Sequence, residues 1–564
     1  MIHMPRRPGP AFLLCGIGLA WSATGALAAD PAPRFDPQRL SQIVKTVSGD
    51  DFEGRAPATP AEGKTVDYLV AQFKAAGLVP GGDLEGGKRG WTQSVPLVKT
   101  DFRGAPQLTL QVGAQRDALV QGEQIAVRAT MDGSTAVSIR EAPLVFVGYG
   151  VSAPERRWDD YKGVDLKGKI AVVLVNDPDF ETGANGSGDF GGKAMTYYGR
   201  WTYKFEEAAR RGALGVLIVH ETAPAAYGWA TVKNSNTAAM LDIERDRPAA
   251  VHPKLEAWIQ RDVAVELLRR AGLDFEAQKK LAQTREFQPQ VLKDASLTAE
   301  YAIERQVIVS KNVVGRVEGR SRPGETVIYS AHWDHLGVGA PDAKGDRIYN
   351  GAVDNGTGLA ALIEMGRAFA SAPKKPERSV VFLAVTAEER GLLGSEFYGA
   401  KPLYPLAKTV AVLNMDALGP EGPARNFSTS GSAVSQLQDL LVDEAKGFGL
   451  AYAPDPHPEA GYFFRSDHFS FAKRGVPALS FASGNDWVEG GLAAGEASAK
   501  AYTAERYHQP ADEWRADWSF TGMAHDLPLL YRVGEMLANS KRWPEWGQGS
   551  EFRATREASR SERR

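Results

Sequence analysis

The sequence predicts an α/β protein with a mostly parallel central sheet flanked by helices, into which a second, β-rich α/β domain is inserted. Two observations carry this prediction. Apolar runs of strand length alternate with helical stretches after about residue 300, which is typical of βαβ units and a parallel sheet. A separate α/β pattern, from about 140 to 275, precedes that region. The chain has 564 residues, 43% of them hydrophobic, so it can bury a large core.

The first 28 residues are organised like a secretory signal peptide. Arg6 and Arg7 precede an apolar run at 11–19, and small residues then lead to the A-x-A site at Ala26-Leu27-Ala28. An uncleaved membrane anchor is the alternative, but glycine, serine and threonine dilute the run, and no later stretch reaches the roughly 18 apolar residues of a spanning helix. We therefore expect an exported protein, periplasmic or secreted, with no stable membrane association after signal cleavage.

Charge and cysteine content exclude several classes of protein. Lys and Arg total 66 and Asp and Glu total 69, a net charge of −3 that argues against a nucleic-acid partner. Cys15 is the single cysteine and lies in the signal segment. A disulfide framework within one chain and a cysteine-based metal site are both excluded. Composition leaves the oligomeric state open.

The elements before residue 300 follow from local patterns. A helical region spans 36–80, with a periodic stretch at Thr65–Phe73 and a stop at Gly77. Alternating polar and apolar residues make 106–150 β-rich. The α/β unit that follows has these predicted elements: strands Ile170–Val175 and Gly215–His220, a helix at Tyr203–Arg211, and a closing amphipathic helix at 254–270.

Strands and helices alternate again after residue 300. The predicted elements are Thr326–Ser330, Gly358–Ala370, Ser379–Val385, Thr409–Met415 and Ala433–Ala445. Residues 549–564 are rich in Arg and Glu and poor in apolar residues, which is typical of a solvated tail. The predicted organisation is a signal peptide at 1–28, a main domain split into 30–125 and 285–545, an insert at 126–284, and a polar tail at 546–564.

Metal-capable side chains follow three of the predicted strands. His332, the pair Glu388-Glu389, and Asp416 each come at or directly after a strand end. Ligands of an open parallel sheet bind beyond the carboxyl ends of its strands, so these side chains should converge. Asp354 lies in a glycine-rich loop that opens a helix and can aim its carboxylate at the same edge. His508 adds a second imidazole from a later loop.

Two imidazoles and three carboxylates suit zinc, which takes nitrogen and oxygen ligands. Five ligands exceed the needs of one tetrahedral ion, but two Zn²⁺ ions sharing Asp354 would use them all. Glu388 is then the spare carboxylate beside the attacking water, placed to take its proton and return it to the leaving amine. Asp334 can accept the other ring N–H of His332 and fix its tautomer.

This combination resembles the M28 family of co-catalytic di-zinc aminopeptidases. The motifs are His-x-Asp at His332, Asp-Asn-Gly-x-Gly at Asp354, Glu-Glu at Glu388, Asn-Met-Asp at Asp416, and a late His508. Residues 47–80 resemble the family's N-terminal segment, and the insert resembles a protease-associated (PA) domain, notably at 202–220. The resemblance implies a zinc-exopeptidase fold of the phosphorylase/hydrolase-like type.

The resemblance also implies roles for individual residues. His332, Asp354 and Asp416 would hold one zinc, and Asp354, Glu389 and His508 the other. Glu388 would be the general base and Asp334 the orienting acid. A cis peptide bond would follow Asp354. The family often has a tyrosine that stabilises the oxyanion before a Ser-Asp segment, and Tyr462 is the candidate here.

The expected protein is an exported di-zinc exopeptidase that removes N-terminal residues from peptide substrates. A carboxypeptidase of the same fold, a glutaminyl-cyclase-like acyltransferase with one zinc, and a non-catalytic receptor-like homologue are the alternatives. No ligand position is left for His335 or His468, which we expect to support the ligands or pack in loops. A dinucleotide-like pattern at 186–191 does not directly follow a strand, so nucleotide binding is not expected.

Overall fold

The computed structural model describes residues 32–183, 188–431 and 434–563, and its central feature is a core of four parallel strands. Their spatial order is β22 (Ala478–Ser483), β19 (Thr409–Met415), β15 (Arg322–His332) and β18 (Arg378–Val385). Antiparallel strands flank this core, β20 (Asn426–Thr429) beside β22 and β14 (Gln290–Val317) beside β18. The predicted α/β class with a mostly parallel central sheet is confirmed.

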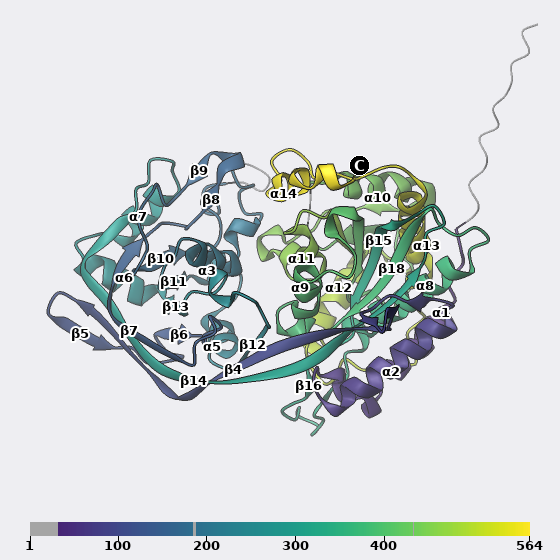
Figure 1. Cartoon of the computed structure of the whole chain (residues 1–564), viewed down its shortest axis with the longest axis horizontal. Helices are drawn as coiled ribbons and strands as arrows, with labels where there is room; N and C mark the ends of the chain where they lie inside the picture. Colours follow the sequence, from purple (N-terminus) through teal and green to yellow (C-terminus); the bar gives the residue numbers. More distant parts are fainter. Residues whose placement is uncertain (1–31, 184–187, 432–433, 564) are drawn as a thin grey trace, which may run out of the picture. The chain divides into compact units, whose positions relative to one another are not determined.

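Helices cover both faces of this parallel core (Figure 1). One face carries α1 (Pro37–Val47), α8 (Gly358–Ser371) and α13 (Thr521–Asn539), and the other carries α9 (Leu393–Ala400) and α11 (His468–Ala472). Along β15, Val327 and Tyr329 join the first hydrophobic core, while Ile328 joins the second. A strand buried on both faces reads as an unbroken apolar run, which is why these strands could be predicted.

The N-terminal helical prediction is also confirmed. α1 begins after Asp36, whose side chain accepts the backbone N–H of Gln38, and α2 (Pro60–Ala75) ends just before Gly77. Gly77 has a φ of +84°, a conformation that glycine adopts without strain. The other helices of this part are α10 (Gln436–Ala445), α12 (Gly491–Glu505) and α14 (Arg553–Ala558).

A second parallel sheet core occupies the predicted insert. It contains β7 (Ala136–Phe146), β10 (Ile170–Leu174), β11 (Gly215–His220) and β13 (Leu255–Gln260), with β6 (Ile125–Val127) antiparallel at its edge. Its helices are α3 (Trp201–Arg210), α4 (Thr222–Ala225), α5 (Trp229–Asn236), α6 (Arg261–Arg270) and α7 (Phe275–Ala282). The strands and the helix predicted between 170 and 220 are all present.

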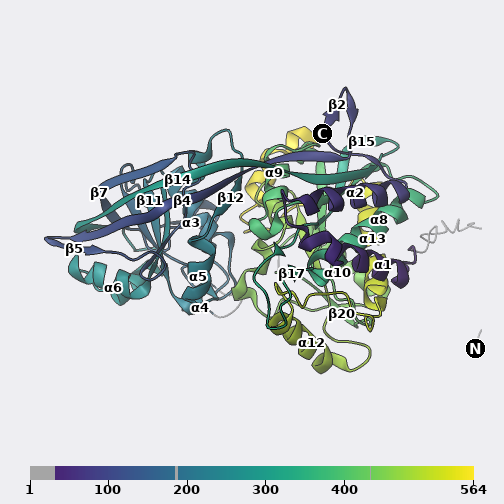
Figure 2. The same cartoon turned by 90° about the horizontal axis from the view of Figure 1, so that it is seen from below.

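Two long antiparallel strands connect the two cores. β4 (Thr92–Val112) pairs with β14 along nearly its whole length, and both can be followed from one core to the other in Figure 2. β14 pairs with β18 at one end and with β7 at the other. β5 (Gln115–Ala118) and β12 (Met240–Ile243) pair with β4. The insert core therefore takes in residues of β4 and β14, and its boundaries at 126 and 284 stay a prediction.

Short strands complete the described structure. They are β1 (Val79–Pro80), β2 (Leu84–Glu85), β3 (Lys88–Arg89), β8 (Ser152–Ala153), β9 (Trp158–Asp159), β16 (Gly337–Val338), β17 (Ile348–Tyr349) and β21 (Ala451–Tyr452). Among the described residues, no helix combines the length and the apolar character needed to cross a membrane. The predicted signal peptide lies outside the described residues.

Two segments differ from their predictions. The predicted closing helix at 254–270 is helical only from Arg261, because Leu255–Gln260 form β13 and pair in parallel with β11. The segment predicted as a solvated tail is folded: α14 packs on the protein, and Arg556 is 1% exposed. The Arg556 guanidinium donates to the backbone carbonyls of Thr409 and Val410. A buried arginine is stable where backbone carbonyls accept its hydrogen bonds. The composition of the segment does not show that such acceptors are nearby, so it could not predict this role.

Candidate metal centre and active site

The predicted ligands converge at the carboxyl edge of the parallel core. His332 is the last residue of β15, Glu389 lies in the turn after β18, and Asp416 directly follows β19. These three strands are neighbours in the sheet, so their ends meet although they are far apart in sequence. Asp354 and His508 reach the same place from loops.

One group of ligands surrounds His332. Its Nε2 lies 3.2 Å from Asp354 Oδ1 and 3.2 Å from Asp416 Oδ1. The ring is 1% exposed. Burial opposes the charged form of His332, but the Glu388 and Asp416 carboxylates raise its pKa well above the usual value. This is the group that the resemblance assigned to the first zinc.

A second group surrounds His508. Its Nε2 lies 3.2 Å from Asp354 Oδ2 and 3.1 Å from Glu389 Oε2. Asp354 therefore turns one carboxylate oxygen to each imidazole. His335 joins this group, with its Nδ1 2.6 Å from Glu389 Oε1. It is fully buried, and its position against Glu389 suits a residue that orients a ligand.

The loop that carries Asp354 is fixed by glycine and by amide hydrogen bonds. Gly351 has a φ of +58°, and a Cβ there would lie 2.3 Å from the Asp354 carbonyl oxygen, so only glycine fits. The Asp354–Asn355 peptide bond is cis, as the resemblance implied. The Asn355 amide donates to the Met415 carbonyl and accepts from the backbone N–H groups of Gly358 and Ala417.

Asp512 supports the same loop and was not singled out from the sequence. Its carboxylate accepts the backbone N–H of Val353 at 3.1 Å and that of Asp354 at 3.1 Å. The side chain is fully buried, and burial raises its pKa to about 6. Asp512 lies four residues after His508, so one loop supplies both an imidazole and a support for Asp354.

Arg55 is a second support that sequence reasoning missed. Its guanidinium is fully buried and donates to four backbone carbonyls, including those of Trp333 at 2.8 Å and Gly351 at 2.8 Å. Burial lowers the pKa of Arg55 to about 10, although Asp512 and other nearby carboxylates oppose this shift. It joins the N-terminal segment to the loops that carry His332 and Asp354.

Asp334 acts differently from the prediction. The nearest acceptor for His332 Nδ1 is the Asp334 backbone carbonyl at 3.1 Å, whereas the carboxylate lies 3.9 Å away. That carboxylate instead accepts the backbone N–H of Glu388 at 3.0 Å and of Glu389 at 3.3 Å. Asp334 lies two residues after His332, and at this separation its backbone carbonyl is closer to the imidazole ring than its side chain is. Asp334 thus positions both glutamates.

Glu388 and Tyr462 face a cavity of about 730 Å³ beside these ligands. Burial raises the pKa of Glu388 well above its usual range, and the neighbouring Asp416 carboxylate adds to this shift. A carboxylate whose pKa is raised towards the working pH can both take a proton from water and give it up again. Tyr462 is 41% exposed and lines the same cavity, so it can reach a substrate bound there.

The side chains fit zinc by their chemistry. Ligand atoms of His332, Asp354 and Asp416 lie within 4.8 Å of one another, as do those of His335, Asp354 and Glu389. Both groups share Asp354, and all of these atoms are the nitrogen and oxygen donors that zinc takes. So many buried carboxylates in one place are unfavourable without a cation to balance them.

The fold and these side chains fit an α/β metalloprotein, and part of the chain is similar to a known family. Residues 312–530 match the family model described as Peptidase family M28. Aminopeptidase NAALADL1 of Mus musculus is 36% identical over 112 residues, which cover 19% of this chain and 13% of that protein. A probable zinc metalloprotease of Pyricularia oryzae is 32% identical over 108 residues, 19% of this chain and 21% of that protein.

The chain is also similar to solved structures. The aminopeptidase from Aneurinibacillus sp. strain AM-1 is 20% identical, with 90% of this chain and 96% of that chain covered and a TM-score of 0.47. The two curated relatives are matched over 13% and 21% of their own length. Residues 312–530 contain all five predicted metal ligands, and this part of the chain matches the model of Peptidase family M28. Together with the aminopeptidase and zinc metalloprotease among the relatives, this match supports a zinc metallopeptidase.

Proposed function

We propose that the protein is a di-zinc aminopeptidase that hydrolyses peptides from their N-terminal end. The observation that carries this proposal is the placement of Asp354, whose two carboxylate oxygens each lie 3.2 Å from a different imidazole. A shared carboxylate of this kind suits a pair of metal ions. The choice of the N-terminal end rests on the aminopeptidases among the proteins similar to this chain.

When bound, zinc supplies Lewis acidity at the scissile carbonyl and acidifies a water molecule. The protein's own residues then move the protons. Glu388 accepts the proton of the attacking water and returns it to the leaving amine. Asp334 fixes the backbone at Glu388, and Tyr462 donates from the cavity wall to the developing oxyanion.

The test is to count the metal and follow the product. Purified protein should hold two zinc ions per chain and release the N-terminal residue from leucyl peptides, and a chelator should abolish release. N-terminal acetylation should block turnover, whereas C-terminal amidation should permit it. The reverse pattern would identify a carboxypeptidase, and a single zinc with cyclisation of N-terminal glutamine would identify a cyclase.

The role of Glu388 is tested by Glu388→Gln. The variant should retain its zinc and lose about 10²- to 10⁴-fold in kcat, the usual contribution of a general base. Glu489→Gln is the matched control, because Glu489 is exposed and makes no ion pair in the described structure. A Glu388→Gln variant with full zinc and full activity would assign the base to another group.

We further propose that the protein is exported, with residues 1–28 as its signal peptide, and that it is not membrane-anchored after cleavage. The support is the order of basic, apolar and small residues before Ala28. N-terminal sequencing of the protein recovered from the periplasm or medium should begin at Ala29. Recovery of the uncleaved chain in the membrane fraction would contradict this.

A further inference from the structure

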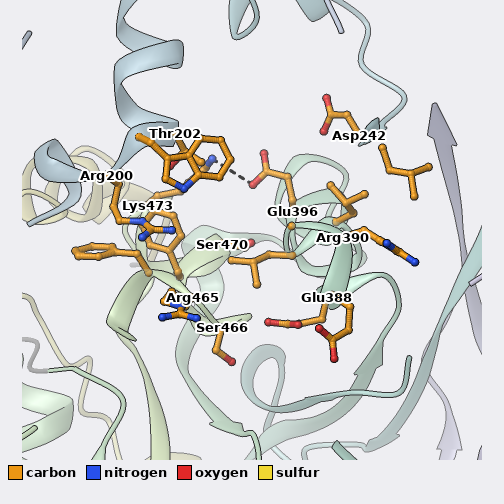
Figure 3. A pocket seen from close by; sticks show the side chains of 18 of the residues that line it. Arg200, Thr202, Asp242, Glu388, Arg390, Glu396, Arg465, Ser466, Ser470 and Lys473 are labelled. Atoms are coloured by element: carbon orange, nitrogen blue, oxygen red, sulfur yellow. Dashed lines mark ion pairs between the residues drawn. The ribbon is translucent and has the colours of Figure 1, made fainter. Parts of the chain in front are cut away.

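The cavity beside the metal centre has a wall that the proposed chemistry does not use. Its lining includes Glu388 on one side and, from the insert, Arg200, Trp201 and Thr202 at the start of α3. Arg465, from the loop that follows Tyr462, lines it as well. Figure 3 shows Arg200 and Arg465 on the same side of this cavity.

The start of α3 is open to an anion. No side chain caps the helix, and its first turn holds no acidic residue. The free N–H groups of a helix start carry a partial positive charge and donate to anions. In α3, a helix of 10 residues, this end lines the cavity at Trp201 and Thr202.

Arg200, the residue before α3, has no partner for its charge among the described residues. Its buried Nε makes no hydrogen bond, and Arg200 forms no ion pair within the described part of the chain. Burial lowers the pKa of Arg200 to about 10, and the positive charge of Arg465 adds to this shift. A guanidinium left unpaired in a partly desolvated wall favours a bound anion.

Arg465 supplies a second unpaired charge. In the described structure it makes no ion pair, and its guanidinium lies 5.2 Å from the centre of the Tyr462 ring. It directly precedes Ser466, whose hydroxyl donates to Asp416 at 2.5 Å. Arg465 is therefore one residue away from a side chain that contacts a predicted metal ligand.

Three other cationic side chains of the cavity are already paired with carboxylates. Lys473 pairs with Glu206 at 3.2 Å and with Glu396 at 3.3 Å, an ion pair drawn in Figure 3. Arg245 pairs with Asp242 and Glu396, and Arg128 pairs with Glu256. On the wall that the start of α3 and the Tyr462 loop form, unpaired positive charge therefore lies at Arg200, Arg465 and the helix start. Arg390 also lines the cavity without an ion pair among the described residues, but its guanidinium points away from Arg200 in Figure 3.

We propose that Arg200, Arg465 and the N-terminal end of α3 form a carboxylate-binding subsite for the part of the substrate beyond the scissile bond. This inference rests on the proposed peptidase function and names its substrate class. The carboxylate is either the α-carboxylate of a short peptide or an acidic side chain next to the cleaved bond. Arginine matches a carboxylate with two parallel hydrogen bonds, and helix N–H groups add to them.

Matched substrates test the subsite. Leu-Gly as the free acid, Leu-Gly amide and Leu-Glu amide share one scissile bond type and differ in their carboxylates. The parent should show a KM at least about 10-fold lower for a carboxylate-bearing substrate than for Leu-Gly amide, since a charged hydrogen bond is worth about one order of magnitude or more. Preference for Leu-Gly acid identifies the α-carboxylate, and preference for Leu-Glu amide identifies the side chain.

Variants assign this preference to residues. Arg200→Met and Arg465→Met should each raise KM for the preferred substrate about 10- to 100-fold and leave Leu-Gly amide unchanged, which also shows that they fold. Arg390→Met is the matched control, because Arg390 lines the cavity but its guanidinium points away from Arg200 in Figure 3. Equal loss on all substrates, or equal effects of all three variants, would overturn the subsite.

A binding measurement separates this inference from the proposed function. A dipeptide with a reduced peptide bond, as the acid and as the amide, is titrated calorimetrically into the zinc-loaded parent and Arg200→Met. Tighter binding of the acid that Arg200→Met abolishes supports the subsite even if no peptide is hydrolysed. Hydrolysis of leucine p-nitroanilide with equal binding of both probes overturns the subsite and leaves the peptidase proposal standing.

Discussion

Replacing Asp512 by Asn should weaken metal binding without touching a metal ligand. The buried carboxylate accepts the backbone N–H of Val353 and of Asp354, each at 3.1 Å. Asparagine keeps the volume, but one of its oxygens becomes an NH₂ group that faces these donors. At least one charge-assisted hydrogen bond is lost, which costs about 1.5–3 kcal/mol. Because Asp354 then moves relative to both imidazoles, zinc affinity should fall about 10- to 100-fold.

Competition with a chromophoric chelator measures this affinity directly. Asp517→Asn is the control, because Asp517 lies on the same segment but is exposed, and in the described part of the chain its one ion pair is with Arg515. An exposed ion pair contributes about 0–1 kcal/mol, so the control should bind zinc like the parent. Unchanged affinity in a folded Asp512→Asn variant would refute the reasoning, since Asp354 would then hold its place without the carboxylate.

Three further perturbations test other parts of the structure. Glu396→Gln should cost about 3 kcal/mol in the free energy of unfolding by urea titration, because it leaves the partly buried charge of Arg474 uncompensated and removes one of the two carboxylate partners of Arg245. Lys473 and these arginines hold the pKa of Glu396 well below its usual value. The contribution of Glu396 to stability is therefore present above its unfolded pKa of about 4.3 and is lost as the pH falls below that value. A stability difference between parent and variant that did not shrink in acid would contradict this. Ser466→Ala removes the donor to Asp416 and should lower zinc affinity about 10-fold in the same competition assay, while an unaltered affinity would show that Asp416 needs no such support. Chelation should lower the midpoint of thermal unfolding and added zinc should restore it in a concentration-dependent way, and a midpoint indifferent to zinc would exclude a metal site in the folded state.

The convergence of the predicted ligands was accessible from sequence because it follows from local rules. His332, Glu389 and Asp416 each come at or after the end of an apolar run. Strands that are buried on both faces have such runs, so they are the easiest elements of a parallel sheet to predict from sequence. Their convergence needed no knowledge of loop structure, since the carboxyl ends of neighbouring parallel strands meet. Asp354 could be predicted from the glycines around it, because they permit the close approach of the Gly351 backbone to the Asp354 carbonyl oxygen.

The residues that hold the metal ligands in place could not be predicted, because no local sequence pattern marks them. Arg55 and Asp512 act through backbone carbonyls and N–H groups that are distant in sequence, and no spacing links them to the residues they hold. His335 follows Asp334 by one residue, but only the folded loop shows that it contacts Glu389. The prediction of a helix at Leu255–Gln260 was wrong for a related reason. Pairing with β11, which is distant in sequence, makes this segment a strand, whereas its local pattern resembles that of an amphipathic helix.

The insert contributes to the cavity beside the metal centre, so its attachment bears on specificity. Lys473 and Glu396, from the catalytic part, pair with Glu206 and Arg245 of the insert. These ion pairs lie beside the wall that carries Arg200, and Glu206 is itself on α3. Breaking the Glu396 network should therefore do more than destabilise the chain. It should also loosen the position of Arg200 and weaken recognition of the proposed carboxylate. Hydrolysis of leucine p-nitroanilide, which lacks a carboxylate, should be unchanged.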